Sequence, residues 1–305
     1  MVGPMERYEI ETFLALAEEL HFTRTAERLL VSPGRVSQTI KQLERRLGGA
    51  LFERSSHHVA LTSVGEQLYA ELLPAHREVQ RAVENASAAF AGISGVLRVG
   101  FTTPWSGALL LRAVEAFHSR RPRCTVQLQE LTYNAALPAL RDADVDLVIT
   151  VLPVEDAAIT VGPVLFSEPR ALVVPADHPL AARETVSLED LAVLPLIMGG
   201  GMSRAWLDAH FLRRTPQGRP VRHGPIASGW QEVLALVGAG KGASVAPVRA
   251  GLYHGRPDVV YVPFEDVPPF DYALMWRDAG DTALLREFVR TLHEFVPQAR
   301  RSVPV

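Results

Sequence analysis

The chain has 305 residues, of which 48% are hydrophobic, and its formal net charge is −3. This length exceeds what one hydrophobic core usually supports, so two domains are expected. The single cysteine, Cys124, excludes an internal disulfide and a cysteine-based metal cluster. No run approaches the roughly 20 apolar residues that span a bilayer, and no signal peptide is recognisable. We therefore expect a cytoplasmic protein without a membrane partner.

Three short amphipathic helices are predicted near the N-terminus. In the second, Thr23 is the expected N-cap, and in the third Ser32 caps the helix while Pro33 occupies a position that needs no N–H. The third helix should end at Gly48 and Gly49. Residues expected to face a shared core are Ile10, Phe13, Leu14, Leu16, Ala17 and Leu20 in the first helix, Phe22, Ala26, Leu29 and Leu30 in the second, and Val36, Ile40, Leu43 and Leu47 in the third.

Two helices joined by such a tight turn are typical of a helix-turn-helix that reads DNA. The N-terminal end of the second helix of such a pair enters the major groove, where side-chain donors read base edges. An ordinary helical hairpin with a solvated face is the alternative. The residues predicted to bind DNA are Ser32, Pro33, Gly34, Arg35, Ser37, Gln38, Lys41, Arg54, His57 and His58.

A winged hairpin is predicted directly after these helices. Residues 51–54 and 59–62 have the character of two short strands, with Arg54 placed near a phosphate or the minor groove. His57 and His58 would lie at the tip, solvated or near phosphate, because no further ligands stand at zinc spacing. Between residues 21 and 62 there are seven Arg or Lys against three acids, which is the local positive charge that phosphate attraction requires.

From residue 13 to 69 the sequence FLALAEELHFTRTAERLLVSPGRVSQTIKQLERRLGGALFERSSHHVALTSVGEQLY resembles the DNA-binding segment of the LysR-type transcriptional regulators. The resemblance implies that Ser37 and Gln38 contact base edges or adjacent phosphates and that Arg54 grips the backbone at the wing. The chain departs from the family pattern at the start of the third helix. The family usually has Gln followed by Pro or Ser, whereas this chain has Pro33-Gly34-Arg35, and we expect Arg35 to replace the missing glutamine.

A long helix is predicted over residues 63–90, interrupted only by Pro74, which should kink it. Its apolar stripe follows coiled-coil spacing and predicts pairing with the same helix of a second chain. Packing of the stripe on its own domain is the alternative. The resemblance implies the same dimerising linker, and hence a homodimer or homotetramer on double-stranded DNA with dyad symmetry. The stripe consists of Leu68, Leu72, Ala75, Val79, Ala82, Ala86 and Ala89.

Strands alternate with helices beyond a hinge at residues 91–95, which predicts an α/β domain with a mostly parallel sheet. Expected strands are 97–101, 125–131, 146–150, 171–174, 196–198, 243–247, 259–262 and 272–276, and expected helices are 106–119, 135–142, 188–192, 203–212, 229–238 and 283–295. The resemblance implies a periplasmic-binding-protein-like effector domain. The predicted organisation is a winged helix-turn-helix at 1–62, a linker helix at 63–90, and an effector domain at 96–300 with subdomain I (96–162 and 268–300) and subdomain II (163–267).

A cleft between the two subdomains is the predicted effector site, because ligands bind at the carboxyl ends of strands in such sheets. Thr103 can also cap a helix whose free N–H groups would donate hydrogen bonds to a carboxylate. Phe264 is equally compatible with packing at the crossover. Trp105, Tyr133 and Trp230 indicate an aromatic or partly apolar small molecule, and the alternative is that these aromatic side chains belong to the core. The predicted effector-binding residues are Thr102, Thr103, Thr132, Tyr133, Gly200, Ser203, Trp230, Gln231 and Phe264.

The sequence gives no support for catalysis or for a cofactor. The glycine-rich segment 238–242 follows a helix and precedes a strand, the reverse of a phosphate-binding loop, and no GxSxG or HExxH pattern occurs. We therefore predict a regulator of transcription whose DNA binding responds to a small molecule, with RNA polymerase as a further contact. The alternative is a solute-binding or enzymatic α/β domain whose N-terminal helices serve assembly.

Overall fold

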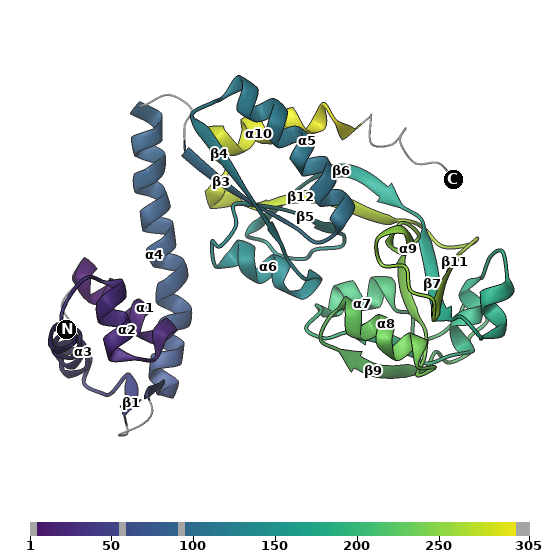
Figure 1. Cartoon of the computed structure of the whole chain (residues 1–305), viewed down its shortest axis with the longest axis horizontal. Coiled ribbons are helices and arrows are strands. Elements are labelled where there is room, and N and C mark those ends of the chain that lie inside the picture. The colour runs from purple at the N-terminus through teal and green to yellow at the C-terminus, as the bar shows by residue number, and fades with distance from the viewer. Residues whose placement is uncertain (1–4, 55–58, 91–94, 297–305) are drawn as a thin grey trace. The chain divides into compact units, whose positions relative to one another are not determined.

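The computed structural model describes residues 5–54, 59–90 and 95–296 (Figure 1). At residues 54, 81 and 84–90 it describes the backbone alone. The chain forms two compact units, Met1–Ser87 and Ala88–Val305.

Unit 1 is built on three helices whose apolar sides meet in one core. The side chains of Phe13, Leu16, Val36, Ile40 and Leu43 are fully buried, as predicted for the inward faces of the first and third helices. Leu20 and Leu47 are 40% and 37% exposed, so their predicted burial is wrong. Both lie at a helix end, since Leu20 caps α1 with a left-handed φ of 48° and Leu47 is the last residue of α3. Ser32 accepts a hydrogen bond from the Arg35 N–H at 3.3 Å, and Gly48 ends the third helix with a left-handed φ of 85°. The helices are α1 (Arg7–Glu19), α2 (Phe22–Arg28) and α3 (Pro33–Leu47).

The ends of α2 differ from the prediction. The N-cap is His21, whose imidazole accepts the Arg24 N–H, and not Thr23, which lies within the helix. Leu30 is 92% exposed, so its predicted burial is wrong. The helix ends at Arg28, and Leu30 adopts a left-handed φ of 55° in the turn, which points the side chain away from the core.

A two-stranded antiparallel hairpin follows α3, as predicted for a wing. Its strands are β1 (Phe52–Arg54) and β2 (Val59–Leu61), with Phe52 opposite Leu61. The Glu44 carboxylate accepts the N–H groups of Leu51 and Phe52 at 3.0 and 3.2 Å, so the end of α3 fixes the start of the wing.

The helix α4 (Ser63–Phe90) has the predicted bounds and continues through Pro74. Its apolar stripe serves two purposes along its length. Leu68 and Leu72 pack against the core of unit 1, together with Tyr69 and Leu73. Ala75, Val79 and Ala82 are exposed, and Val79 is 63% exposed. Packing on the chain's own domain therefore accounts for the first part of the stripe and leaves the second part uncovered within unit 1.

Unit 2 contains a five-stranded sheet in the order β4-β3-β5-β12-β6. Alternate side chains of β5 point to opposite faces: Leu147 and Ile149 join α5 and α10, whereas Val148 joins α6. Figure 1 shows α10, from the end of the chain, beside α5. The elements are β3 (Gly95–Phe101), β4 (Cys124–Glu130), β5 (Leu147–Val151), β6 (Ile159–Glu168), β12 (Phe270–Arg277), α5 (Pro104–Arg120), α6 (Tyr133–Arg141) and α10 (Ala283–His293).

The rest of unit 2 forms an antiparallel sheet, β10-β7-β11, and a parallel pair, β8-β9. Helices and strands here are β7 (Arg170–Pro175), β8 (Leu196–Gly199), β9 (His223–Ala227), β10 (Ser244–Pro247), β11 (Val259–Pro263), α7 (Arg204–His210), α8 (Trp230–Gly238) and α9 (Ala250–Tyr253). Three short 3₁₀ helices are η1 (Pro179–Ala182), η2 (Leu188–Ala192), where an α-helix was expected, and η3 (Asp278–Gly280).

The prediction of a mostly parallel sheet is correct for β4-β3-β5 and for the pair β8-β9, but not for the other strand pairs of unit 2. β12 is antiparallel to both β5 and β6, and β7 is antiparallel to both of its neighbours. The reason is that β6, which the sequence analysis missed, leads into β7 with only Pro169 between them. The chain therefore leaves one sheet and enters the other without a helix, and no parallel crossover forms there.

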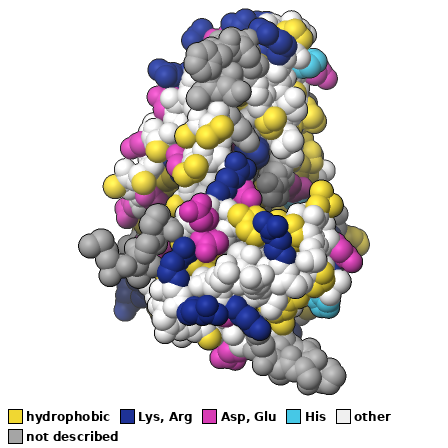
Figure 2. Space-filling view, turned by 90° about the vertical axis from the view of Figure 1, so that its left-hand side faces the viewer, with side chains coloured by type: hydrophobic (Ala, Val, Ile, Leu, Met, Phe, Trp, Pro, Cys, Tyr) yellow, Lys and Arg dark blue, Asp and Glu magenta, His cyan; other side chains and the backbone are white. Residues whose placement is uncertain are grey.

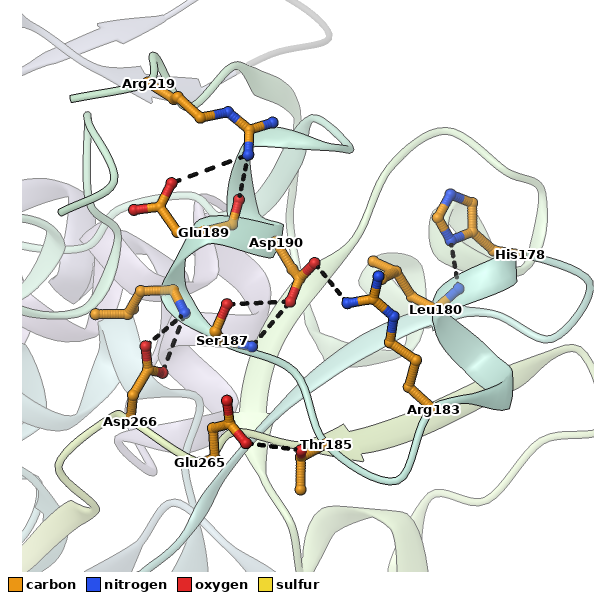
Figure 3. Close-up of polar contacts among 11 residues, drawn as sticks. His178, Leu180, Arg183, Thr185, Ser187, Glu189, Asp190, Arg219, Glu265 and Asp266 are labelled. Atoms are coloured by element: carbon orange, nitrogen blue, oxygen red, sulfur yellow. Dashed lines mark hydrogen bonds and ion pairs between the residues drawn. The ribbon is translucent and has the colours of Figure 1, made fainter. Parts of the chain in front are cut away.

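Two extended segments connect the sheets, one at Pro169 and one between β11 and β12. The second is fastened to residues 178–190, which we call the crossover clasp (Figure 3). The Thr185 hydroxyl donates to Glu265 at 3.0 Å, and the Leu188 N–H donates to Asp266 at 3.0 and 3.1 Å. Asp190 holds the clasp together by accepting from Arg183 and Ser187. The connection is thus anchored as far as residue 266.

Candidate functional site

The outer face of α3 presents the predicted DNA-binding side chains. Pro33, Gly34, Arg35, Gln38 and Lys41 are exposed, as is the capping residue Ser32, and Ser37 is half-buried. The opposite face is buried through Val36 and Ile40. Because a buried face fixes the rotation of a helix, the polar residues are held outward from a rigid element.

Ion pairs within unit 1 divide its basic residues into two groups. Arg28 and Arg46 pair with Glu18 and Glu9 of α1, each at 2.6 Å, and Arg24 lies 3.6 Å from Glu19. The sequence analysis missed these acids because they precede the segment over which charge was counted. No ion pair of Arg35, Lys41 or Arg45 occurs within the described part of unit 1, so these α3 cations retain their charge for a partner.

Arg35 is further oriented by an aromatic contact. Its guanidinium carbon lies 4.9 Å from the centroid of the Tyr8 ring, so α1 supports this side chain. On the face shown in Figure 2, dark-blue Lys and Arg side chains recur, interspersed with acids. Three predicted positions are not settled by the structure: the Arg54 side chain, His57 and His58 lie outside what it describes.

Unit 2 contains a cavity of about 200 Å³ between its two sheets. The first residues of three helices line it, Pro104 of α5, Tyr133 of α6 and Trp230 of α8. Free N–H groups at these helix ends carry partial positive charge and favour a ligand with acceptor atoms. Thr103 caps α5, with its hydroxyl 3.4 Å from the Ser106 nitrogen.

Six of the predicted effector residues line the cavity: Thr102, Thr103, Thr132, Tyr133, Gly200 and Trp230. Three do not. Ser203 instead caps α7 by accepting the Trp206 N–H at 3.2 Å, and Gln231 is exposed one residue into α8. Phe264 lies at the crossover, where its N–H donates to the Arg170 carbonyl at 2.9 Å. This position agrees with the alternative interpretation, in which Phe264 packs at the crossover.

The cavity walls include residues that sequence reasoning missed. Trp206, Phe211, Phe270 and Tyr272 supply apolar surface from α7, the residue after it, and β12. Glu130 adds a polar group from the end of β4, and His254 adds one directly after α9. A signal existed for Glu130, because it lies one residue before the end of the predicted strand 125–131, and Thr102 and Thr132 directly follow predicted strands. The aromatic residues come from segments that meet only after folding.

Two phenols form a hydrogen-bonded pair beside the cavity. The hydroxyl oxygens of Tyr133 and Tyr272 lie 3.0 Å apart. Burial raises the pKa of Tyr133 to about 12 and that of Tyr272 well above its ordinary value. Both therefore stay protonated near neutral pH and offer a neutral donor and acceptor rather than a negative charge.

The described residues hold no cluster of three or more His, Cys, Asp or Glu able to bind a metal ion. Among the same residues, no helix combines the length and apolar character needed to cross a membrane.

A winged helix-turn-helix whose third helix exposes Arg35, Lys41 and Arg45, followed by an α/β unit with a cavity, is the architecture of a ligand-responsive DNA-binding protein. A family model described as "Bacterial regulatory helix-turn-helix protein, lysR family" matches residues 8–66, and one described as "LysR substrate binding domain" matches residues 90–297. The chain belongs to the LysR family of transcriptional regulators.

The chain is 28% identical over 290 residues to the HTH-type transcriptional regulator AlsR of Bacillus subtilis, covering 93% of this chain and 94% of the relative. It is 32% identical over 262 residues to the DNA-binding transcriptional dual regulator OxyR of Escherichia coli, covering 84% and 83%. The structure of full-length CbnR complexed with its target DNA superposes with a TM-score of 0.69 at 24% identity, covering 95% and 99%. The family and these relatives are regulators and not enzymes, which sets the enzymatic alternative aside.

Proposed function

We propose that α3 enters the major groove of its target DNA, with Arg35, Ser37 and Gln38 at base edges and Lys41 at a phosphate. The observation that supports this is the exposed face of α3, whose cations have no ion pair within the described part of unit 1, opposite a face that is fully buried. Arg35 can contact guanine with two donors, whereas Gln38 can contact adenine with a donor and an acceptor. Because it acts on chromosomal DNA, the protein works in the cytoplasm.

The uncovered part of the α4 stripe supports assembly through a second copy of the chain. Ala75, Val79 and Ala82 are exposed at coiled-coil spacing, and burial against the same residues of a partner removes them from water. A dimer presents two recognition helices to a dyad-symmetric site, and two dimers form the tetramer that extended sites require.

We propose that a small molecule in the unit 2 cavity controls this DNA binding. It stabilises the arrangement in which the two sheets approach, and the resulting shift in population changes DNA bending and access of RNA polymerase. Another relative, from Escherichia coli O6:H1, is named "Hydrogen peroxide-inducible genes activator". An intramolecular disulfide cannot form in this chain, because Cys124 is its only cysteine.

Paired substitutions test the DNA-binding assignment. Gln38→Ala should relax preference at one base pair, with a loss of about 1–3 kcal/mol on the cognate site alone. Lys41→Ala should weaken binding on all sequences and reduce the slope of affinity against salt by about one ion. Binding of the intact protein to promoter and scrambled duplexes is measured by fluorescence anisotropy at several salt concentrations. Equal affinity of the wild type for both duplexes rejects the assignment.

A further inference from the structure

The charges around the unit 2 cavity indicate what its ligand carries. Helices α5, α6 and α8 have 17, 9 and 9 residues, and all three begin at the cavity wall. Trp105 also lines the wall, is 5% exposed, and has an indole N–H without a hydrogen-bond partner in the described structure. These donors gather where an acceptor group, above all a carboxylate, is stabilised.

No arginine or lysine contributes to the cavity wall within residues 95–296. Two cations that adjoin wall residues, Arg249 next to Ala250 and Arg170 on the ring of Phe270, are engaged with other groups. Arg249 lies 3.1 Å from the carboxylate of Glu168, and the Arg170 guanidinium stacks on Phe270 at 4.2 Å from the ring centroid. A ligand carboxylate is therefore held by neutral donors and helix ends, not by a side-chain cation.

One wall residue carries a negative charge. Glu130, at the end of β4, is exposed, and neither a hydrogen bond nor an ion pair engages its carboxylate within the described structure. His254 stands near it on the other subdomain. Burial lowers the pKa of His254, and the charge of Glu130 only partly opposes this. A neutral imidazole leaves the Glu130 charge free for a positively charged group of the ligand.

Resting on the proposed function, we propose that the effector is a zwitterion, namely an α-amino acid with an apolar side chain. Its carboxylate faces the N-termini of α5, α6 and α8, its ammonium group pairs with Glu130, and its side chain lies against Trp206, Phe211 and Tyr272. The cavity of about 200 Å³ lies below the roughly 300–1,000 Å³ of pockets for drug-sized ligands, so its ligand is a small molecule such as a single amino acid. Glu130 is then the residue that selects amino acids over simple carboxylic acids.

The test is isothermal titration of the intact protein with matched ligands. Valine, leucine, isoleucine, methionine and phenylalanine are compared with the deaminated acids 4-methylpentanoate and 3-phenylpropanoate and with the amines 3-methylbutylamine and 2-phenylethylamine. At least one amino acid should bind at least tenfold more tightly than its acid and amine counterparts. Glu130→Gln should reduce amino-acid affinity about tenfold or more, as expected when a hydrogen bond to a charged group is lost, and leave affinity for the acid unchanged. Glu115→Gln, an exposed acid on α5, is the control and should change neither.

The outcomes separate this inference from the proposed function. Equal affinity for an amino acid and its deaminated acid, or an equal effect of Glu130→Gln on both, overturns the zwitterion while leaving an effector cavity. Absence of binding by every amino acid in the series also overturns it. Sequence-specific DNA binding by the same preparation shows in each case that the protein is folded and that the DNA-binding proposal still stands.

Discussion

Replacing two glycines of unit 1 by alanine, one at a time, should change the stability of the unit in opposite directions. Gly65 lies in the first turn of α4, where an added Cβ would overlap the carbonyl oxygen of Leu51 and lie 3.1 Å from its carbonyl carbon. The obstacle is backbone, fixed by the Thr62 N–H, which donates to the same oxygen at 2.9 Å. Overpacking of this kind costs about 3 kcal/mol, or roughly a hundredfold in the folding equilibrium. Gly34 in α3 has nothing within 4 Å of such a Cβ, so Gly34→Ala should stabilise the helix by about 0.5 kcal/mol.

Hydrogen exchange of the full-length protein, followed by mass spectrometry over α1, α2 and α3, measures both effects in the same unit. Gly65→Ala should speed exchange of the protected amides about a hundredfold, while Gly34→Ala should slow it slightly. The reasoning is refuted if Gly65→Ala exchanges like wild type, or if the two variants change in the same direction by similar amounts. Unchanged exchange of β3 and β5 in unit 2 shows that the effect is local.

The remaining predictions concern assembly and pH. Val79→Asp should weaken self-association at least tenfold in sedimentation measurements, because it places two like charges on the paired stripe. Gln80 is exposed and lies outside the stripe, so Gln80→Asp should change self-association little. Equal effects of the two substitutions would contradict the pairing. Burial, aided by the charge of Arg170, lowers the pKa of His210 from 6.5 to about 4. As the pH falls, the unfolded chain therefore binds a proton at this histidine before the folded chain does. The contribution of His210 to stability is complete above about pH 6.5 and is lost as the pH falls towards 4. The free energy of unfolding should fall by about 3 kcal/mol over this pH range in the wild type and change much less in His210→Gln, as measured by urea unfolding at fixed protein concentration. Parallel pH profiles of the two proteins would rule out this role of His210.

Local chemistry made much of unit 1 predictable. The start of α3 follows from Ser32 and Pro33, its end from Gly48, and the bounds of α4 from the lack of turn signals over residues 63–90. Each of these features depends on a few adjacent residues. Leu30 was misplaced because its apolar character fits a helix, whereas its orientation depends on a left-handed turn that sequence periodicity does not reveal.

Through-space partners account for most of what was missed. The pairing of Arg28 with Glu18 and of Arg46 with Glu9 joins different helices, so a count of charge along the chain overstates the positive charge left for DNA. In unit 2 the ends of predicted strands pointed to five of the cavity residues, Thr102, Thr103, Thr132, Tyr133 and Gly200, since strand ends meet at one edge of a sheet. Trp230 was identified from the start of a predicted helix. The aromatic wall comes from α7 and β12, and their approach depends on how the second sheet runs, which the missed strand β6 determines.

Three of the four tryptophans, Trp105, Trp206 and Trp230, line the cavity. Indole fluorescence is sensitive to its immediate surroundings, so most of this protein's intrinsic emission originates where an effector would displace water. The tryptophan fluorescence of the unlabelled protein can therefore report ligand binding. Fractions of a metabolite extract can be screened by this change in fluorescence before the effector has been identified.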